Sequence, residues 1–270
     1  MHRPIQEIPI LVDGRRVSHL AMRLDEPAGA RESPLVVLYL HGFGSSQEGT
    51  KAAFFRRRAV ADGLAFCSFD FQGHGESGGA MFELSLTRNL ADVAAVHGEL
   101  ARRGYRDVVL LGSSMGGGTA LWYAALHPDA IAAALHVAPS VALHQGLLRK
   151  VGPEDARRWE RAGRLEIAGE LVTCELGWGL IEDLRSYPLE RLESIYRTPT
   201  LILQGKKDAS VPWEQVLEFV TGCAYEELEL HLMAGADHRM LDRLDHVWRL
   251  MRAYLVRRGL VNDPPVPALV

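Results

Sequence analysis

Short apolar runs alternate with longer amphipathic stretches along most of this chain. The runs have the length of buried strands, about four to eight residues. They lie at 35–40, 65–69, 108–111, 132–137, 200–204 and 227–233. Helical spacing follows most of them and is clearest at 85–103; further helices are predicted at 51–62, 117–127, 214–221 and 242–257. Such an alternation predicts an α/β fold with a mainly parallel sheet.

Two segments depart from this alternation. Near the N-terminus, the runs 8–12 and 17–23 flank Asp13-Gly14, which predicts a hairpin at an antiparallel edge of the sheet. Residues 139–198 separate two core strands by far more than a strand-to-helix connection needs. We interpret this stretch as a cap above the strand ends, with 164–169 and 170–175 pairing as a small hairpin. The predicted division is a core of 1–138 and 199–262, a cap of 139–198, and a loose proline-rich tail of 263–270.

The motif Gly112-Ser113-Ser114-Met115-Gly116 joins a predicted strand to a predicted helix. In this setting G-x-S-x-G is the nucleophile elbow, a turn so sharp that its flanking residues must lack bulk. Ser114 has glycine two positions before and two positions after it, whereas Ser113 does not. Ser114 is therefore the predicted nucleophile, and the Met115 N–H at the helix start can hold an oxyanion.

An acid and a histidine follow later strands, in the chain order expected of this motif. Asp208 comes after the run at 200–204, and His238 comes after the run at 227–233. His238 is the predicted base that takes the serine proton, and Asp208 is predicted to orient the imidazole. A second oxyanion donor, the Phe43 N–H, is predicted in the turn His41-Gly42-Phe43-Gly44.

Several residues compete for these roles. Asp237 adjoins His238 in sequence, which rarely lets a carboxylate orient that same ring, so a loop-capping role is favoured. His74 is a rival base and His41 a structural hydrogen-bonding residue. Residues 73–78 satisfy G-x-G-x-x-G, but no helix opens there, which argues against a dinucleotide site. Lys51 stands at the predicted start of a helix, where a lysine at the surface is the plain interpretation.

The chain resembles the α/β-hydrolases over nearly its whole length. The motifs HGFGSS at 41–46, FDFQGHGESGG at 69–79, GSSMGG at 112–117, GKKDASVPW at 205–213 and DHRM at 237–240 carry the resemblance. Within that family, GTKA at 50–53, VPW and DHRM resemble the palmitoyl-protein thioesterase and acyl-glucuronide esterase branch. The serine-aminopeptidase-like and cinnamoyl-esterase groups are neighbours. The resemblance implies an α/β-hydrolase fold, with a mostly parallel sheet of about eight strands, flanking helices and an inserted cap. It also implies a local role for Lys51, in GTKA, that holds the oxyanion turn.

Composition excludes several classes of function. The chain has 270 residues, 34 acidic and 30 basic, and no basic stripe that would favour nucleic acid. No apolar run has the length of a membrane span, and no apolar leader is visible. Three separated cysteines without a CxxC pattern favour a cytoplasmic protein with reduced thiols. No histidine pair has metal-ligand spacing, so neither a metal nor a cofactor is predicted. The oligomeric state is not readable.

The predicted function is a serine esterase or thioesterase that acts on a small-molecule ester or thioester with an apolar acyl part. Its pocket is predicted to include Gly42, His136, Trp159 and Trp178. No cationic pocket is visible in the sequence, which disfavours substrates with many negative charges unless the fold assembles one. Two alternatives stay open, namely an acyltransferase with the same triad and a non-catalytic ligand-binding homologue.

Overall fold

An eight-stranded, mostly parallel sheet forms the centre of the structure, a computed structural model that describes residues 4–12, 15–27, 34–168 and 172–262. At one edge, β2 runs antiparallel to both of its neighbours, β1 and β4. The strands β4, β3, β5, β6, β9 and β10 are parallel to one another. The predicted fold class is therefore confirmed. In spatial order the strands are β1 (Gln6–Val12), β2 (Arg15–Asp25), β4 (Ala65–Phe69), β3 (Leu35–Leu40), β5 (Asp107–Ser113), β6 (Ala133–Val137), β9 (Thr200–Gly205) and β10 (Leu228–Met233).

The central strands are apolar at nearly every position because both faces of the sheet are covered. All residues of β3, β4, β6 and β9 are buried, whereas the edge strand β10 alternates between partly buried and exposed positions. Parallel pairing places the carboxyl ends of β3, β5, β6, β9 and β10 at one edge of the sheet. The loops that follow these strands therefore gather there.

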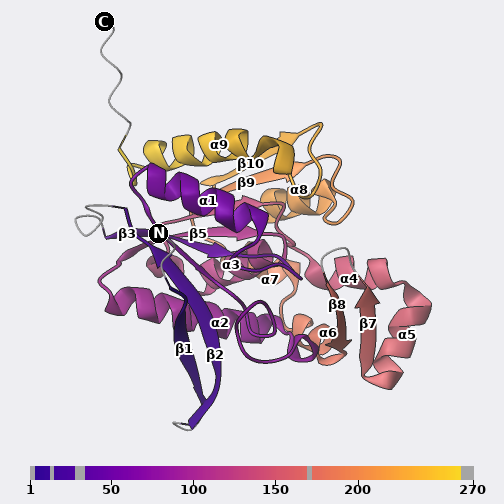
Figure 1. The fold of residues 1–270 in the computed structure, drawn as a ribbon. Coiled ribbons are helices and arrows are strands. Elements are labelled where there is room, and N and C mark those ends of the chain that lie inside the picture. The colour runs from indigo at the N-terminus through magenta and orange to yellow at the C-terminus, as the bar shows by residue number, and fades with distance from the viewer. Residues whose placement is uncertain (1–3, 13–14, 28–33, 169–171, 263–270) are drawn as a thin grey trace, which may run out of the picture.

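Helices cover the two faces of the sheet (Figure 1). On one face, α1 (Thr50–Ala61) and α9 (Leu244–Arg257) bury Phe55 and Val247 against alternate strand residues such as Val37. On the other face, α2 (Leu86–Arg102), α3 (Met115–Leu126) and α8 (Trp213–Gly222) pack their apolar sides. α3 is buried almost all round, and its first residue follows directly from the turn at Ser114.

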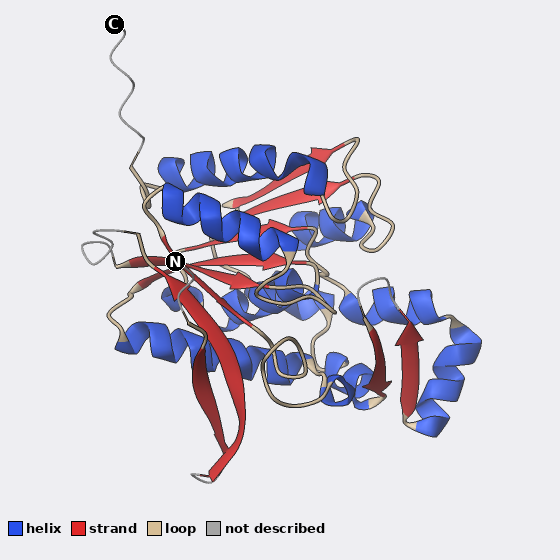
Figure 2. Cartoon of the chain, viewed as in Figure 1, coloured by secondary structure: helices blue, strands red, loops and turns tan. Residues whose placement is uncertain are grey.

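The insertion between β6 and β9 has its own secondary structure. Figure 2 shows its two-stranded ribbon and the helices beside that ribbon projecting beyond the ends of the parallel strands. β7 and β8 pair antiparallel, as predicted, although residues 169–171 between them lie outside the described residues. The last helix, α7, packs against α3 and α8 of the core. The elements are α4 (Leu143–Val151), α5 (Pro153–Ala162), β7 (Arg164–Ala168), β8 (Thr173–Gly177), α6 (Gly179–Leu184) and α7 (Leu189–Ile195).

Two predicted features fall outside the described residues, namely the Asp13-Gly14 turn and the tail at 263–270. The strands on either side of that turn do pair antiparallel. Among the helices that the structure describes, none combines the length and the apolar character needed to cross a membrane.

Candidate active site

Ser114 occupies a sharp turn between β5 and α3. Its backbone has φ 54° and ψ −120°, a conformation that residues with a side chain rarely adopt. The flanking backbone is equally crowded. A Cβ at position 116 would lie 2.3 Å from the Leu40 carbonyl oxygen, and one at position 112 would lie 2.6 Å from the Gly117 Cα. Glycine is therefore required at both flanks of the elbow.

Three side chains from separate loops form one hydrogen-bonded chain. Ser114 Oγ lies 3.0 Å from His238 Nε2, and His238 Nδ1 lies 2.7 Å from Asp208 Oδ2. The serine follows β5, the aspartate follows β9 and the histidine follows β10, so the shared edge of the sheet brings them together. With Nδ1 protonated and directed at the carboxylate, Nε2 is free to accept the serine proton.

The carboxylate of Asp208 is fixed on both oxygens. Oδ1 accepts the backbone N–H groups of Ser210 and Val211 at 2.8 and 2.7 Å. Oδ2 accepts the Gln204 side-chain amide at 3.2 Å in addition to the imidazole of His238. Gln204 lies in β9, four residues before the acid, so the strand itself holds the orientation of the aspartate.

The rival residues have other partners. Asp237 Oδ1 accepts the backbone N–H groups of Arg239 and Met240 at 3.0 and 2.7 Å, which closes its own loop. The Ser113 hydroxyl accepts a hydrogen bond from Lys51. His74 is buried, and its ring packs 5.0 Å from that of His41. Of the two neighbouring serines, Ser114 has its hydroxyl next to the imidazole of His238, whereas Ser113 has its hydroxyl on Lys51.

The turn after β3 faces the nucleophile. A Cβ on Gly42 would lie 3.2 Å from the Ser114 Cβ, so this backbone passes directly beside the serine. His41 holds the turn, because its Nδ1 donates to the Gly42 carbonyl at 2.8 Å while its Nε2 accepts the Phe71 N–H at 3.1 Å. Burial lowers the pKa of His41 to about 4, which keeps the ring neutral and able to accept.

Both predicted oxyanion donors border the same cavity as Ser114. Phe43 follows Gly42 in the turn, and Met115 is the first residue of α3. Because N–H groups in a first helical turn have no acceptor within the helix, the Met115 N–H is available to a ligand. The geometry is thus that of a site able to receive negative charge next to a serine.

Lys51 connects two parts of this site. Its Nζ donates to the Ser113 Oγ at 2.8 Å and lies 3.5 Å from the backbone carbonyl oxygen of His238. The pKa of Lys51 is lowered to about 8, mainly by desolvation; the carboxylates of Asp208 and Asp237 oppose this shift, and the charge of Arg239 adds to it. These contacts link Lys51 to the elbow and to the loop of His238, and its role near the oxyanion turn stays a prediction.

A cavity of about 1060 Å³ opens above the triad. Its floor is formed by Ser114, His238 and the turn at 42–46. Apolar side chains of the cap line the other side, namely Leu143, Leu147, Ile167, Leu176 and Leu180. The cap therefore bounds the space next to Ser114.

The predicted pocket residues are only partly found at this cavity. Gly42 lines it, whereas His136, Trp159 and Trp178 are not among its lining residues. His136 is fully buried in β6. Trp159 is also fully buried, because it packs edge-on against Trp178 at 5.4 Å and donates its Nε1–H to the Leu176 carbonyl. These tryptophans build the interior of the cap.

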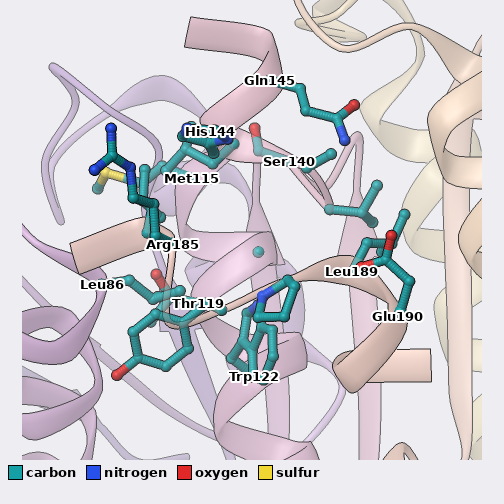
Figure 3. Close-up of a pocket in the computed structure, with 17 residues that line it drawn as sticks. Leu86, Met115, Thr119, Trp122, Ser140, His144, Gln145, Arg185, Leu189 and Glu190 are labelled. Carbon is teal, nitrogen blue, oxygen red and sulfur yellow. The ribbon is translucent and has the colours of Figure 1, made fainter. Parts of the chain in front are cut away.

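A smaller pocket of about 270 Å³ borders the segment 140–143, which also contributes to the lining of the larger cavity. Figure 3 shows Trp122 and Thr119 of α3 at its base, with Arg185 and His144 opposite Leu189 and Glu190. It shares Met115 and Ser140 with the cavity above the triad. The two spaces therefore lie against the same elbow helix.

The protein-family model described as "Serine aminopeptidase, S33" (Hydrolase_4) matches residues 31–172, more than half of the chain. The chain belongs to the Hydrolase_4 family of α/β-hydrolases. Ser114, the oxyanion turn and Lys51 all lie in the part of this α/β-hydrolase that the family model matches, whereas Asp208 and His238 lie beyond it.

Individual relatives include a palmitoyl-protein thioesterase. The mouse palmitoyl-protein thioesterase ABHD10, mitochondrial, is 24% identical over 218 residues, which cover 77% of this chain and 70% of the mouse protein. A protein from Agrobacterium vitis S4, whose name assigns it to the hydrolases, is 27% identical with a TM-score of 0.80, covering 93% of this chain and 99% of that one. Est1E from Butyrivibrio proteoclasticus, solved with ferulic acid bound, is 23% identical with a TM-score of 0.75 at 93% and 99% coverage.

Two features of this α/β-hydrolase site were not found by reasoning from the sequence. Gln204 supports the acid from within an apolar strand, and a polar residue in such a run is the signal that could have revealed it. The contact between Lys51 and Ser113 joins residues 62 positions apart, and no local pattern in the sequence points to it.

Proposed function

We propose that this α/β-hydrolase cleaves carboxylic esters or thioesters with a small to medium apolar acyl group. The observation that carries the proposal is the relay of 3.0 and 2.7 Å that runs from Ser114 through His238 to Asp208. Its esterase and thioesterase relatives support the same class of reaction.

In the proposed reaction, the Ser114 Oγ attacks the acyl carbon while His238 takes the hydroxyl proton. The tetrahedral oxyanion is held by the backbone N–H groups of Phe43 and Met115. The bond from carbon to the leaving oxygen or sulfur then breaks, and His238 gives its proton to that atom. Water, deprotonated by the same imidazole, attacks the acyl-serine and releases a carboxylic acid and free Ser114.

The preference for an apolar acyl group rests on the cap. Leucines from α4, β8 and α6 line the cavity beside the elbow, and burying each methylene of an acyl chain there contributes about 0.8 kcal/mol. The cavity of about 1060 Å³ exceeds the need of a short acyl group alone, so it also accommodates a sizeable leaving group.

The test compares Ser114→Ala with Ser113→Ala, two neighbouring hydroxyl deletions in the same elbow. On p-nitrophenyl butyrate and on an octanoyl thioester, Ser114→Ala should lose about a thousandfold or more in kcat. Ser113→Ala should stay within about tenfold of the parent, because it does not touch the imidazole.

Labelling by a fluorophosphonate, mapped by peptide mass, should occur at Ser114 and disappear in Ser114→Ala. A folded parent that is neither labelled nor active would overturn the proposal in favour of a ligand-binding protein. Product analysis with added alcohol or thiol acceptors separates hydrolysis from acyl transfer, and transfer as the dominant outcome would equally contradict it.

A further inference from the structure

The fold assembles cations around the catalytic cavity that are scattered in the sequence. Lys51, Arg149, Lys150, Lys207 and Arg239 all line it, and Asp237 is the one acidic side chain among its described lining residues. The Asp237 carboxylate is already engaged by two backbone N–H groups. The whole chain has a formal net charge of −4, whereas the described side chains that line the cavity carry a net positive charge.

These cations come from four parts of the fold. Arg149 and Lys150 end α4 in the cap, Lys207 follows β9, Arg239 follows His238, and Lys51 lies in the first turn of α1. A helix C-terminus favours positive charge and accounts for the first two positions, but Lys207 and Arg239 lie in loops. Within the described parts of the chain, Arg149, Lys150 and Lys207 have no ion-pair partner, so an anionic ligand would find them uncompensated.

We propose that the leaving group of the substrate carries a phosphate, so that the enzyme acts on acyl esters or thioesters of a phosphorylated alcohol or thiol. This inference rests on the proposed function. A phosphate monoester has a charge close to −2 at neutral pH and several acceptor oxygens, which match a group of arginine and lysine donors better than a single carboxylate does. The apolar cap residues hold the acyl chain, and the cationic rim holds the phosphate.

Two thioesters that differ only in the phosphate provide the test, namely octanoyl-pantetheine and octanoyl-4′-phosphopantetheine. We expect kcat/KM to be at least about tenfold higher for the phosphorylated substrate at low ionic strength, and the advantage to shrink as salt screens the rim. The octanoyl thioesters of N-acetylcysteine and N-acetylcysteamine form a second pair, which reports the effect of a carboxylate.

Charge reversal in the cap gives a matched comparison. Arg149→Glu/Lys150→Glu should lower the phosphate advantage by about tenfold. Arg157→Glu/Arg161→Glu introduces the same charge change on α5, at exposed residues outside the cavity lining, and should preserve that advantage. The ratio between two substrates of one variant is insensitive to differences in folded fraction.

Equal kcat/KM for the two pantetheine thioesters would overturn the phosphate assignment. So would an equal loss of the phosphate advantage in both double variants, or a larger advantage for the carboxylate than for the phosphate. Failure of the proposed function looks different, because Ser114 would then resist fluorophosphonate labelling and no thioester would be hydrolysed.

Lys51 carries a separate inference that depends on other contacts. Its ammonium reaches the Ser113 hydroxyl, next to the nucleophile, and the backbone carbonyl of His238, the catalytic base. Ser113 is the last residue of β5 and His238 lies in the loop after β10, and the strands β6 and β9 lie between these two strands in the sheet. We infer that Lys51 is a positioning residue, which holds the histidine loop in register with the nucleophile elbow.

Lys51→Met removes the ammonium and keeps most of the side-chain volume. We expect kcat on p-nitrophenyl butyrate to fall by about tenfold or more while KM changes by less than about threefold, because Lys51 acts on the triad geometry. Ser113→Ala should give a smaller fall, and the double variant should be no worse than Lys51→Met because the two share one interaction. Arg57→Met, an exposed change on the same helix, is the control.

A merely structural lysine predicts a lower Tm with kcat per folded, fluorophosphonate-titrated site unchanged, and that result would overturn the inference. If Lys51→Met does not fold, Ser113→Ala still tests the link from the other side. An unaltered kcat in that variant, or losses that simply add in the double variant, would contradict the role.

Discussion

At the scale of single residues, the site depends on two positions where backbone segments meet. Gly112 and Gly116 let β3, β5 and α3 approach so closely that Ser114 is forced into its strained turn. The hydroxyl therefore owes its position to the glycines beside it as much as to the imidazole that it contacts.

Gly116→Ala should destabilise the protein by about 3 kcal/mol or more, because the added methyl group would overlap the carbonyl oxygens of Leu40 and His41. Gly98→Ala, in the open middle of α2, should instead stabilise by about 0.5–1 kcal/mol. Urea denaturation of both variants measures the difference. A Gly116→Ala protein as stable as the parent would show that the elbow has room that the structure does not give it.

The two aspartates beside His238 should differ sharply in their effect on catalysis. Asp208→Asn keeps the shape but favours the wrong imidazole tautomer, so kcat should fall by about a thousandfold or more. Asp237→Asn retains an oxygen for its two N–H donors and should stay within about fivefold. Steady-state kinetics on one ester decides, and the reverse ranking would move the acid role to Asp237.

At the scale of elements, the strands followed from the sequence more closely than the cap. Runs such as 35–40 and 65–69 match β3 and β4 residue for residue, because strands covered on both faces are apolar throughout. The chain order also pointed to Ser114, Asp208 and His238, which the structure joins by hydrogen bonds, since each follows a strand that ends at the same edge of the sheet. Trp159 was misplaced because the direction of a cap side chain depends on β8 and Trp178, which no local pattern specifies.

Trp159 should hold the cap together without supporting the sheet. Trp159→Ala removes a fully buried ring and its bond to the Leu176 carbonyl, at a cost of about 3–5 kcal/mol. Hydrogen exchange should accelerate in β8 and α5 while β3 and β5 keep their protection. Uniform loss of protection across the sheet would show that cap and core unfold as one unit, contrary to this expectation.

At the scale of the whole molecule, buried neutral histidines make the fold sensitive to acid. Burial lowers the pKa of His41 and of His74 to about 4, and that of His136 to about 3. The unfolded chain therefore takes up their protons first, so stability is lost as pH falls below about 6.5, by about 1.4 kcal/mol per pH unit for each ring. Asp92, whose pKa burial raises to about 6, acts in the opposite direction over part of this range.

The free energy of unfolding should consequently drop by roughly 4 kcal/mol between pH 7 and pH 5. His136→Leu removes a ring that makes none of the contacts among Ser114, His238 and Asp208, and it should remove about 2 kcal/mol, nearly half, of that dependence. Urea titrations at the two pH values provide the measurement. A parent protein equally stable at both would mean that these rings are protonated in the fold or hydrated.

The cap enters the chain after β6 and leaves it before β9, two strands that are direct neighbours in the sheet. Its apolar lining and two of the cavity cations thus belong to one uninterrupted stretch, while Ser114, Asp208 and His238 all lie outside it. Exchange of the single gene segment between these two strands would therefore change the substrate range and keep Ser114, Asp208 and His238. The ends of β6 and β9 are suitable boundaries for recombination, in evolution and in the laboratory.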